Sequence, residues 1–140
     1  MTKEDLKKFC LGNPAKPWIS NPWSIGKNSL ATNGYFLIRI PRLKNIPENL
    51  KAPDCSSLWP DQPQEWFEIP KLPGIGKEKI FDQKISIGGV DFGVWLLRIL
   101  KDLPNIKIGP MGEEEPAWIK FDGGDGLIMP MRKEKRMDKQ

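Results

Sequence analysis

The sequence predicts an α+β fold in which two helices pack on antiparallel strands. Three observations indicate it: helical spacing of apolar residues in two stretches, an Asn-Gly dipeptide between two β-prone runs, and a series of short β-prone runs near the end of the chain. The 140 residues are enough to bury one ordinary hydrophobic core. A single domain is therefore the expected organisation.

A short helix is predicted over residues 3–11. Thr2 and Asp5 have the Thr-x-x-Asp spacing of a capping box, in which each side chain accepts a hydrogen bond from the backbone amide of the other residue. The apolar residues that follow recur at helical spacing, and they are Leu6, Phe9 and Cys10. The lysines fall outside this stripe, so the helix should bury one face.

A β-hairpin is predicted after a proline-rich loop at residues 12–22. Two β-prone runs, residues 29–32 and 35–40, flank the dipeptide Asn33-Gly34. Because Asn and Gly both tolerate positive φ, this dipeptide is a strong hairpin signal.

Residues 41–79 are predicted to be irregular but packed on the rest of the domain. They show no sustained period of 2 or 3.6, and they hold half of the chain's fourteen prolines. A proline has no amide for a helix or a central strand. Trp59, Trp66 and Phe67 argue against a free linker, because disordered segments usually lack large aromatic side chains.

A second helix is predicted over residues 93–103, after a strand at 84–87 and a Gly88-Gly89 turn. The apolar side chains that define its buried stripe are Phe92, Trp95, Leu96, Ile99, Leu100 and Leu103. Pro104 ends this helix because it lacks the amide for another turn.

Three β-prone runs follow the second helix, at residues 106–108, 117–121 and 127–129, and predict an antiparallel meander. The run Asp122-Gly-Gly-Asp-Gly126 lacks the further carboxylates of a calcium-binding loop and is predicted to be a turn. Residues 133–140 are nearly all charged, so we expect a flexible, solvated tail.

Composition argues against catalysis. The chain has no histidine, which removes the commonest general base, and no nucleophile elbow or phosphate loop. Two cysteines 45 positions apart predict neither a disulfide framework nor a zinc site. We therefore expect no enzyme activity, no cofactor and no metal. No apolar run approaches the roughly 20 residues that cross a bilayer, and the start of the chain lacks a secretory signal, so a cytoplasmic protein is expected.

Two segments carry motifs of a known family. Residues 31–37 read Ala-Thr-Asn-Gly-Tyr-Phe-Leu, and residues 127–132 read Leu-Ile-Met-Pro-Met-Arg. They resemble the Ala-Thr-Asp-Gly-His-Arg-Leu segment and the terminal Met-Pro-Met-Arg of bacterial sliding clamps, the beta subunit of DNA polymerase III. Residues 92–100 and 116–119 similarly resemble the start of a clamp helix and the penultimate clamp strand.

The resemblance implies one clamp-like (processivity-fold) domain over residues 1–132, with residues 41–79 as a proline-rich insertion. A full clamp subunit has three such domains, and this chain has room for one. We therefore expect a small, bacteriophage-type binding protein that acts in DNA replication or host takeover. Its partner would be a replication or host protein, or DNA. The alternative is a processivity element that assembles into a ring of six copies on duplex DNA.

The resemblance also implies a site. In clamps the two segments line a pocket for short linear peptides, and the residues that carry over are Thr32, Gly34, Leu37, Met129, Pro130, Met131 and Arg132. Asn33, Tyr35 and Phe36 replace Asp, His and Arg, which makes the site more apolar. Because clamps draw the two segments from neighbouring domains, the pocket is expected to form here only between two copies packed head to tail. Alternatively, both segments merely preserve strand and edge geometry.

A DNA-binding face is a further implication of the resemblance. The two helices of a clamp domain lie side by side, which would put Lys7, Lys8, Arg98 and Lys101 on one face, in reach of phosphates. The net charge of +4 and the pI near 9.1 are compatible with this but do not require it.

Overall fold

The computed structural model describes residues 1–10, 20–49, 51–52, 55–74 and 81–131, and it confirms the predicted α+β class. Its helices are α1 (Lys3–Lys7), α3 (Val94–Leu100) and the short 3-10 helix η1 (Ser56–Leu58). Its strands are β1 (Trp23–Ile25), β2 (Asn28–Thr32), β3 (Phe36–Pro41), β4 (Phe67–Glu68), β5 (Lys84–Ile87), β6 (Val90–Gly93), β7 (Lys107–Gly109), β8 (Ala117–Phe121) and β9 (Gly124–Ile128). Among these described residues no helix is long and apolar enough to cross a membrane.

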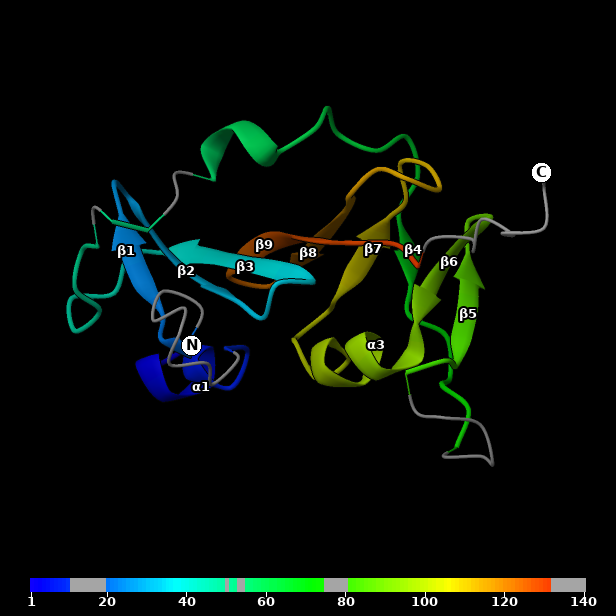
Figure 1. Ribbon diagram of the computed structural model, residues 1–140, viewed down its shortest axis with the longest axis horizontal. Coiled ribbons are helices and arrows are strands. Elements are labelled where there is room, and N and C mark those ends of the chain that lie inside the picture. The colour runs from blue at the N-terminus through cyan, green and yellow to red at the C-terminus, as the bar shows by residue number, and fades with distance from the viewer. Residues whose placement is uncertain (11–19, 50, 53–54, 75–80, 132–140) are drawn as a thin grey trace, which may run out of the picture.

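The main sheet has the strand order β1-β2-β3-β9-β8-β7-β4, and its neighbouring strands are antiparallel. It consists of two meanders, β1 to β3 and β7 to β9, which meet where β3 pairs with β9, and of the two-residue strand β4, which pairs with β7 at the edge. A helix precedes each meander in the chain, and Figure 1 shows α1 and α3 on the same side of the sheet. The chain thus contains two units of the same order, helix and then three strands, joined at β3 and β9.

Helix α1 begins as predicted but is shorter. The Thr2 hydroxyl accepts from the Asp5 amide, the Asp5 carboxylate accepts from the Thr2 amide, and the capping box is confirmed. Beyond Lys7 the amides of Lys8, Phe9 and Cys10 donate to carbonyls three residues back, so the predicted last turn is tighter than an α-helix.

The β2–β3 hairpin is confirmed, although its turn differs from the expected one. Thr32 pairs with Leu37, which leaves four residues between the paired positions. Gly34 has a φ of 93°, whereas Asn33 is not among the described residues with positive φ. The Asn33 side chain instead accepts hydrogen bonds from the amides of Tyr35 and Phe36 at 2.9 and 3.0 Å, and so fixes a wider turn.

The second helix, predicted over residues 93–103, is shorter at both ends: Gly93 belongs to β6, and the helix ends at Leu100, three residues earlier than predicted. Gly88 and Gly89 both have positive φ and connect β5 to β6, so Phe92 belongs to a strand. The prediction that Ile99 belongs to the buried stripe is wrong. Its side chain is 37% exposed, because α3 turns it away from the sheet.

The meander is confirmed, with β9 starting at Gly124, inside the run predicted to be a turn. A Cβ at Gly126 would collide with the Leu37 carbonyl oxygen, which explains a glycine within this strand.

The two faces of the sheet are buried by different parts of the chain. Alternate residues of each strand point to opposite faces. On the face that α1 and α3 cover, called the helix face, Ile38, Ile119 and Ile128 are fully buried beside Leu97 and Leu100. The opposite face, called the outer face, is covered by part of the proline-rich segment, which lies across the sheet from the helices in Figure 1.

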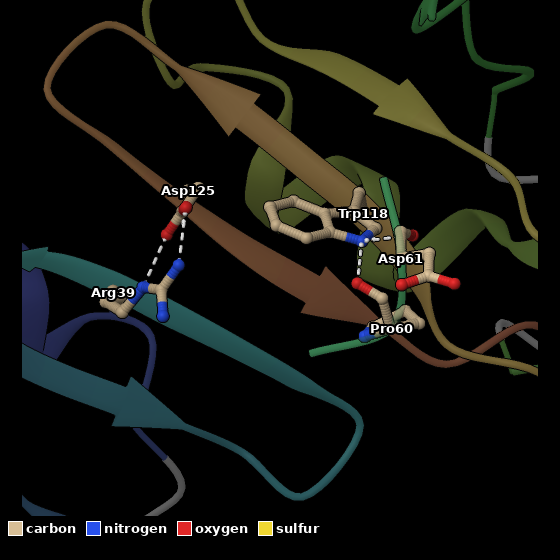
Figure 2. A network of polar contacts seen from close by, with 5 residues as sticks. All are labelled: Arg39, Pro60, Asp61, Trp118 and Asp125. Atoms are coloured by element: carbon tan, nitrogen blue, oxygen red, sulfur yellow. Dashed lines mark hydrogen bonds and ion pairs between the residues drawn. The ribbon is translucent and has the colours of Figure 1, made fainter. Parts of the chain in front are cut away.

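The outer face is held by a network of charged and aromatic side chains (Figure 2). Arg39 on β3 donates from Nε and Nη2 to the Asp125 carboxylate on β9 at 2.8 and 2.7 Å. The Arg39 guanidinium also lies 3.8 Å from the centroid of the Trp59 ring, which the figure does not draw. The Trp118 indole nitrogen donates to the carbonyls of Pro60 and Asp61 at 3.2 and 3.1 Å. Trp118 is the common partner of Trp59 and Trp66, both of which meet it edge to face. Specific side-chain contacts therefore attach the irregular segment to the sheet.

Candidate peptide-binding groove

The two clamp-like segments lie side by side within one copy of the chain. Strand pairing between β3 and β9 brings them together, and the Met129 amide extends it by donating to the Tyr35 carbonyl at 2.9 Å. The expectation that they could meet only between two copies is therefore wrong. The two segments come from opposite halves of the sequence, but their strands are neighbours at the centre of the sheet.

Pro130 occupies a position where its missing amide costs no hydrogen bond. Strand β9 ends at Ile128, and the amides on either side of Pro130 are both used. Met129 donates to Tyr35, and Met131 donates to the Asp91 carbonyl of β6 at 2.7 Å. The predicted place of Pro130 at a strand end is confirmed. Residues 129–131 consequently join the β2–β3 turn to β6.

A cleft of about 760 Å³ opens beside residues 129–131. Three aromatic rings line it in a row: Trp95 meets Tyr35 edge to face at 5.3 Å between centroids and Phe81 at 5.1 Å. Tyr35 and Phe81 are 54% and 61% exposed. Clusters of large, solvent-exposed aromatic side chains are characteristic of binding surfaces.

A smaller cleft of about 400 Å³ lies on the other side of the β2–β3 turn. Its walls include Trp23, Leu37 and Leu58, of which Leu58 is 55% exposed. Both clefts share Gly34, Tyr35 and Met129. We call the two clefts together the apolar groove. No charged residue is among the described residues that line it.

The wall between the two clefts is fixed by its own hydrogen bonds. The Thr32 hydroxyl donates to the Phe36 carbonyl at 2.5 Å and accepts from the Gly34 amide at 3.0 Å. Together with the two bonds to Asn33, these contacts hold the turn in one conformation before any ligand arrives. A preorganised wall lowers the entropy that binding must cost.

The groove collects most of the residues predicted from the clamp resemblance. Thr32 and Leu37 line the smaller cleft, Pro130 and Met131 line the larger, and Gly34 and Met129 line both, whereas Arg132 lies outside the described residues. The sequence interpretation missed Phe81 and Trp95. Trp95 was assigned to the buried stripe of the second helix, and no pattern around Phe81 distinguished it.

The cations predicted to bind DNA are divided between two places. Lys7 is exposed at the end of α1 and Lys8 directly after it, and Lys8 borders a groove between α1 and α3 whose walls also include Asp5, Asp102 and Asp122. Arg98 and Lys101 border a separate cleft that Lys8 does not line. The two helices share one side of the sheet, but the described structure does not bring the four cations into one cleft. DNA binding by these residues stays a prediction.

Other candidate chemistry is limited among the described residues. No group of three or more His, Cys, Asp or Glu residues is placed to hold a metal ion there. Burial raises the pKa of the Cys10 thiol to about 11, which keeps it protonated and poorly nucleophilic near neutral pH.

We compared the chain with protein-family models, curated proteins and solved structures, and none of them matched.

Proposed function

We propose that this chain is a non-enzymatic binding protein whose apolar groove receives a short linear peptide of another protein. The observation that carries the proposal is the convergence at one groove of six residues, taken from two distant segments, that the clamp resemblance singled out. The uncharged lining selects a peptide with apolar and aromatic side chains rather than a charged one. The two adjacent clefts, of about 760 and 400 Å³, share three lining residues and give space for separate side chains of one extended peptide.

A relationship to one sliding-clamp domain is part of this proposal. It is supported by the motifs at residues 31–37 and 127–132 and by the two helix-plus-meander units with both helices on one side of the sheet. In that interpretation the partner is a component of a DNA replication machinery or a host protein, and the chain is a bacteriophage-type accessory or inhibitor.

The second candidate is the ring on duplex DNA, which is favoured by the position of α1 and α3 on one side of the sheet. One sheet edge argues against it. The Ser24 amide of β1 donates to the Pro47 carbonyl and the Ser24 carbonyl accepts from the Asn49 amide, so this edge is already partly paired. Light scattering separates the two functions, because a ring requires a hexamer whereas peptide binding needs only the monomer.

The test of peptide binding begins with selection from a library of displayed random peptides. We expect enrichment of sequences with two or more apolar or aromatic residues in close succession. The affinity of a selected peptide is then measured for the Met129→Ser, Met131→Ser variant. We expect it to fall about tenfold or more, because the loss of each apolar contact costs on the order of 1 kcal/mol.

Met111→Ser is the matched control, since Met111 is also partly buried but lines a different cleft. It should leave peptide affinity unchanged. Thermal unfolding of all variants completes the test. The proposal fails if no such peptide is enriched, if the double variant binds normally, or if its stability collapses together with its affinity, which would make the two methionines core residues.

A further inference from the structure

The cleft that Arg98 and Lys101 border has a volume of about 780 Å³ and lies between α3, β7 and the segment that follows β4. Four cations from these three elements line it. Lys71 comes from the segment after β4, Arg98 from α3, Lys101 from the position directly after α3, and Lys107 from β7. We call it the basic cleft. It shares no lining residue with the apolar groove.

The charge in the basic cleft is strongly unbalanced. Glu68 is the only carboxylate among the described residues that line it, so four positive charges and one negative charge leave a net charge of +3. Glu68 lies opposite Lys107 in the β4–β7 register. Within the described part of the chain, none of the four cations forms an ion pair with a carboxylate.

Arg98 shows this imbalance at the level of single atoms. Its Nη2 donates to the neutral carbonyl of Pro73, and its Nε is buried without a hydrogen-bond partner among the described residues. A half-buried guanidinium held by one neutral acceptor loses hydration without gaining a counter-charge. An anion in the cleft would supply that counter-charge.

We infer that the basic cleft binds a compact phosphate-bearing anion, such as pyrophosphate or the phosphate groups of a nucleotide. A guanidinium fork and several ammonium groups are the donors that phosphate oxygens accept from most strongly. The volume lies within the range of small-molecule sites. Leu72 and Ile106 add an apolar wall, against which the non-phosphate part of a nucleotide can pack.

This site is separate from the groove of the proposed function, and either can fail without the other. Peptide binding is tested with Met129 and Met131, and anion binding with Lys71 and Lys101. Both lysines are exposed, so replacing them by glutamine should leave folding intact, which thermal unfolding checks.

The experiment is calorimetric titration of the full chain with pyrophosphate at low ionic strength. We expect saturable binding at one site that weakens as salt is added, because mobile ions screen the attraction. The Lys71→Gln, Lys101→Gln variant should bind about tenfold more weakly or worse, because two charge-assisted hydrogen bonds are lost.

Lys27→Gln, Lys44→Gln is the control. It removes the same charge from two exposed lysines that adjoin the β1 end of the sheet, and it should bind pyrophosphate normally. The inference is overturned if no saturable binding is found or if the two double variants lose affinity equally.

Two further titrations identify the source of the phosphate. Tighter binding of a nucleoside triphosphate than of pyrophosphate would support the inference and assign the apolar wall to the nucleoside. Binding of duplex DNA through Lys71 and Lys101 without binding of pyrophosphate would overturn it, because the cations would then act as an open surface rather than as a site for a compact anion.

Discussion

The two faces of the main sheet are stabilised in different ways. The helix face is a continuous apolar core in which Leu97, Leu100 and Ile119 are fully buried. The outer face has a smaller apolar cluster around Trp23 and relies on paired side chains, such as Arg39 with Asp125. The free energy gained by burying apolar area does not depend on how the side chains are oriented toward one another, whereas ion pairs and ring contacts require a fixed geometry. The proline-rich segment, whose regular structure between β3 and β5 is limited to η1 and β4 among the described residues, can therefore be held on the outer face by such contacts.

The apolar groove lies where these two faces meet. Trp23 and Leu37 of the outer-face cluster line its smaller cleft, while Trp95 and Leu96 beside the helix-face core line the larger one. Both clefts border the end of the β3–β9 pair, because Tyr35 and Met129 line both of them. A ligand in the groove would contact both faces, so changes on either face can be checked for their effect on binding as well as on stability.

The largest loss of stability is expected on the helix face. Leu100→Ala removes a fully buried side chain from the contact between α3 and the sheet and should lower the free energy of unfolding by about 2–5 kcal/mol. Urea denaturation followed by tryptophan fluorescence measures it. A loss below about 1 kcal/mol would show that α3 does not pack on the sheet as described.

A smaller loss is expected on the outer face. Arg39→Ala removes two charge-assisted hydrogen bonds to Asp125 and the contact with Trp59, and it should cost about 1–2 kcal/mol. Arg39 and Asp125 are about a quarter exposed, and this partial solvent screening keeps the estimate modest.

Arg39→Lys is the sharper version of this experiment. It keeps the charge but cannot form the two parallel bonds, so we expect it to restore less than half of the loss. Full rescue by lysine would mean that charge alone, and not the geometry of the guanidinium, holds the outer face together.

The sequence predicted those elements whose signals are local. The capping box of Thr2, the β2–β3 hairpin and the final meander each depend on residues close together in the chain. Strand β6 was missed because Phe92 fits helical spacing with the residues after it as well as the strand alternation that includes Val90. The short-range pattern alone could not decide between the two.

Contacts between distant residues were beyond the sequence patterns. Arg39 and Asp125 are 86 positions apart, and neither residue carries a motif that points to the other. The groove is an intermediate case. The motifs identified Met129 and Leu37 as site residues, but only the pairing of β3 with β9 shows that they meet in one copy.

The smallest effect is expected at Ile99, next to Leu100 on the same helix. The apolar stripe of the sequence treats the two residues as equivalent, yet Ile99 is 37% exposed and Leu100 is fully buried. Ile99→Ala should therefore lower the free energy of unfolding by less than about 1 kcal/mol, because surface substitutions outside special contacts have small effects.

Ile99 borders the groove between α1 and α3. If a second copy of the chain covers that groove, the loss at Ile99 will grow as protein concentration rises, because association stabilises the folded state by mass action. Measuring Ile99→Ala and Leu100→Ala by urea denaturation at two protein concentrations separates the cases. A small, concentration-independent loss at Ile99 supports the monomer, and a large, concentration-dependent one supports assembly through the helix side.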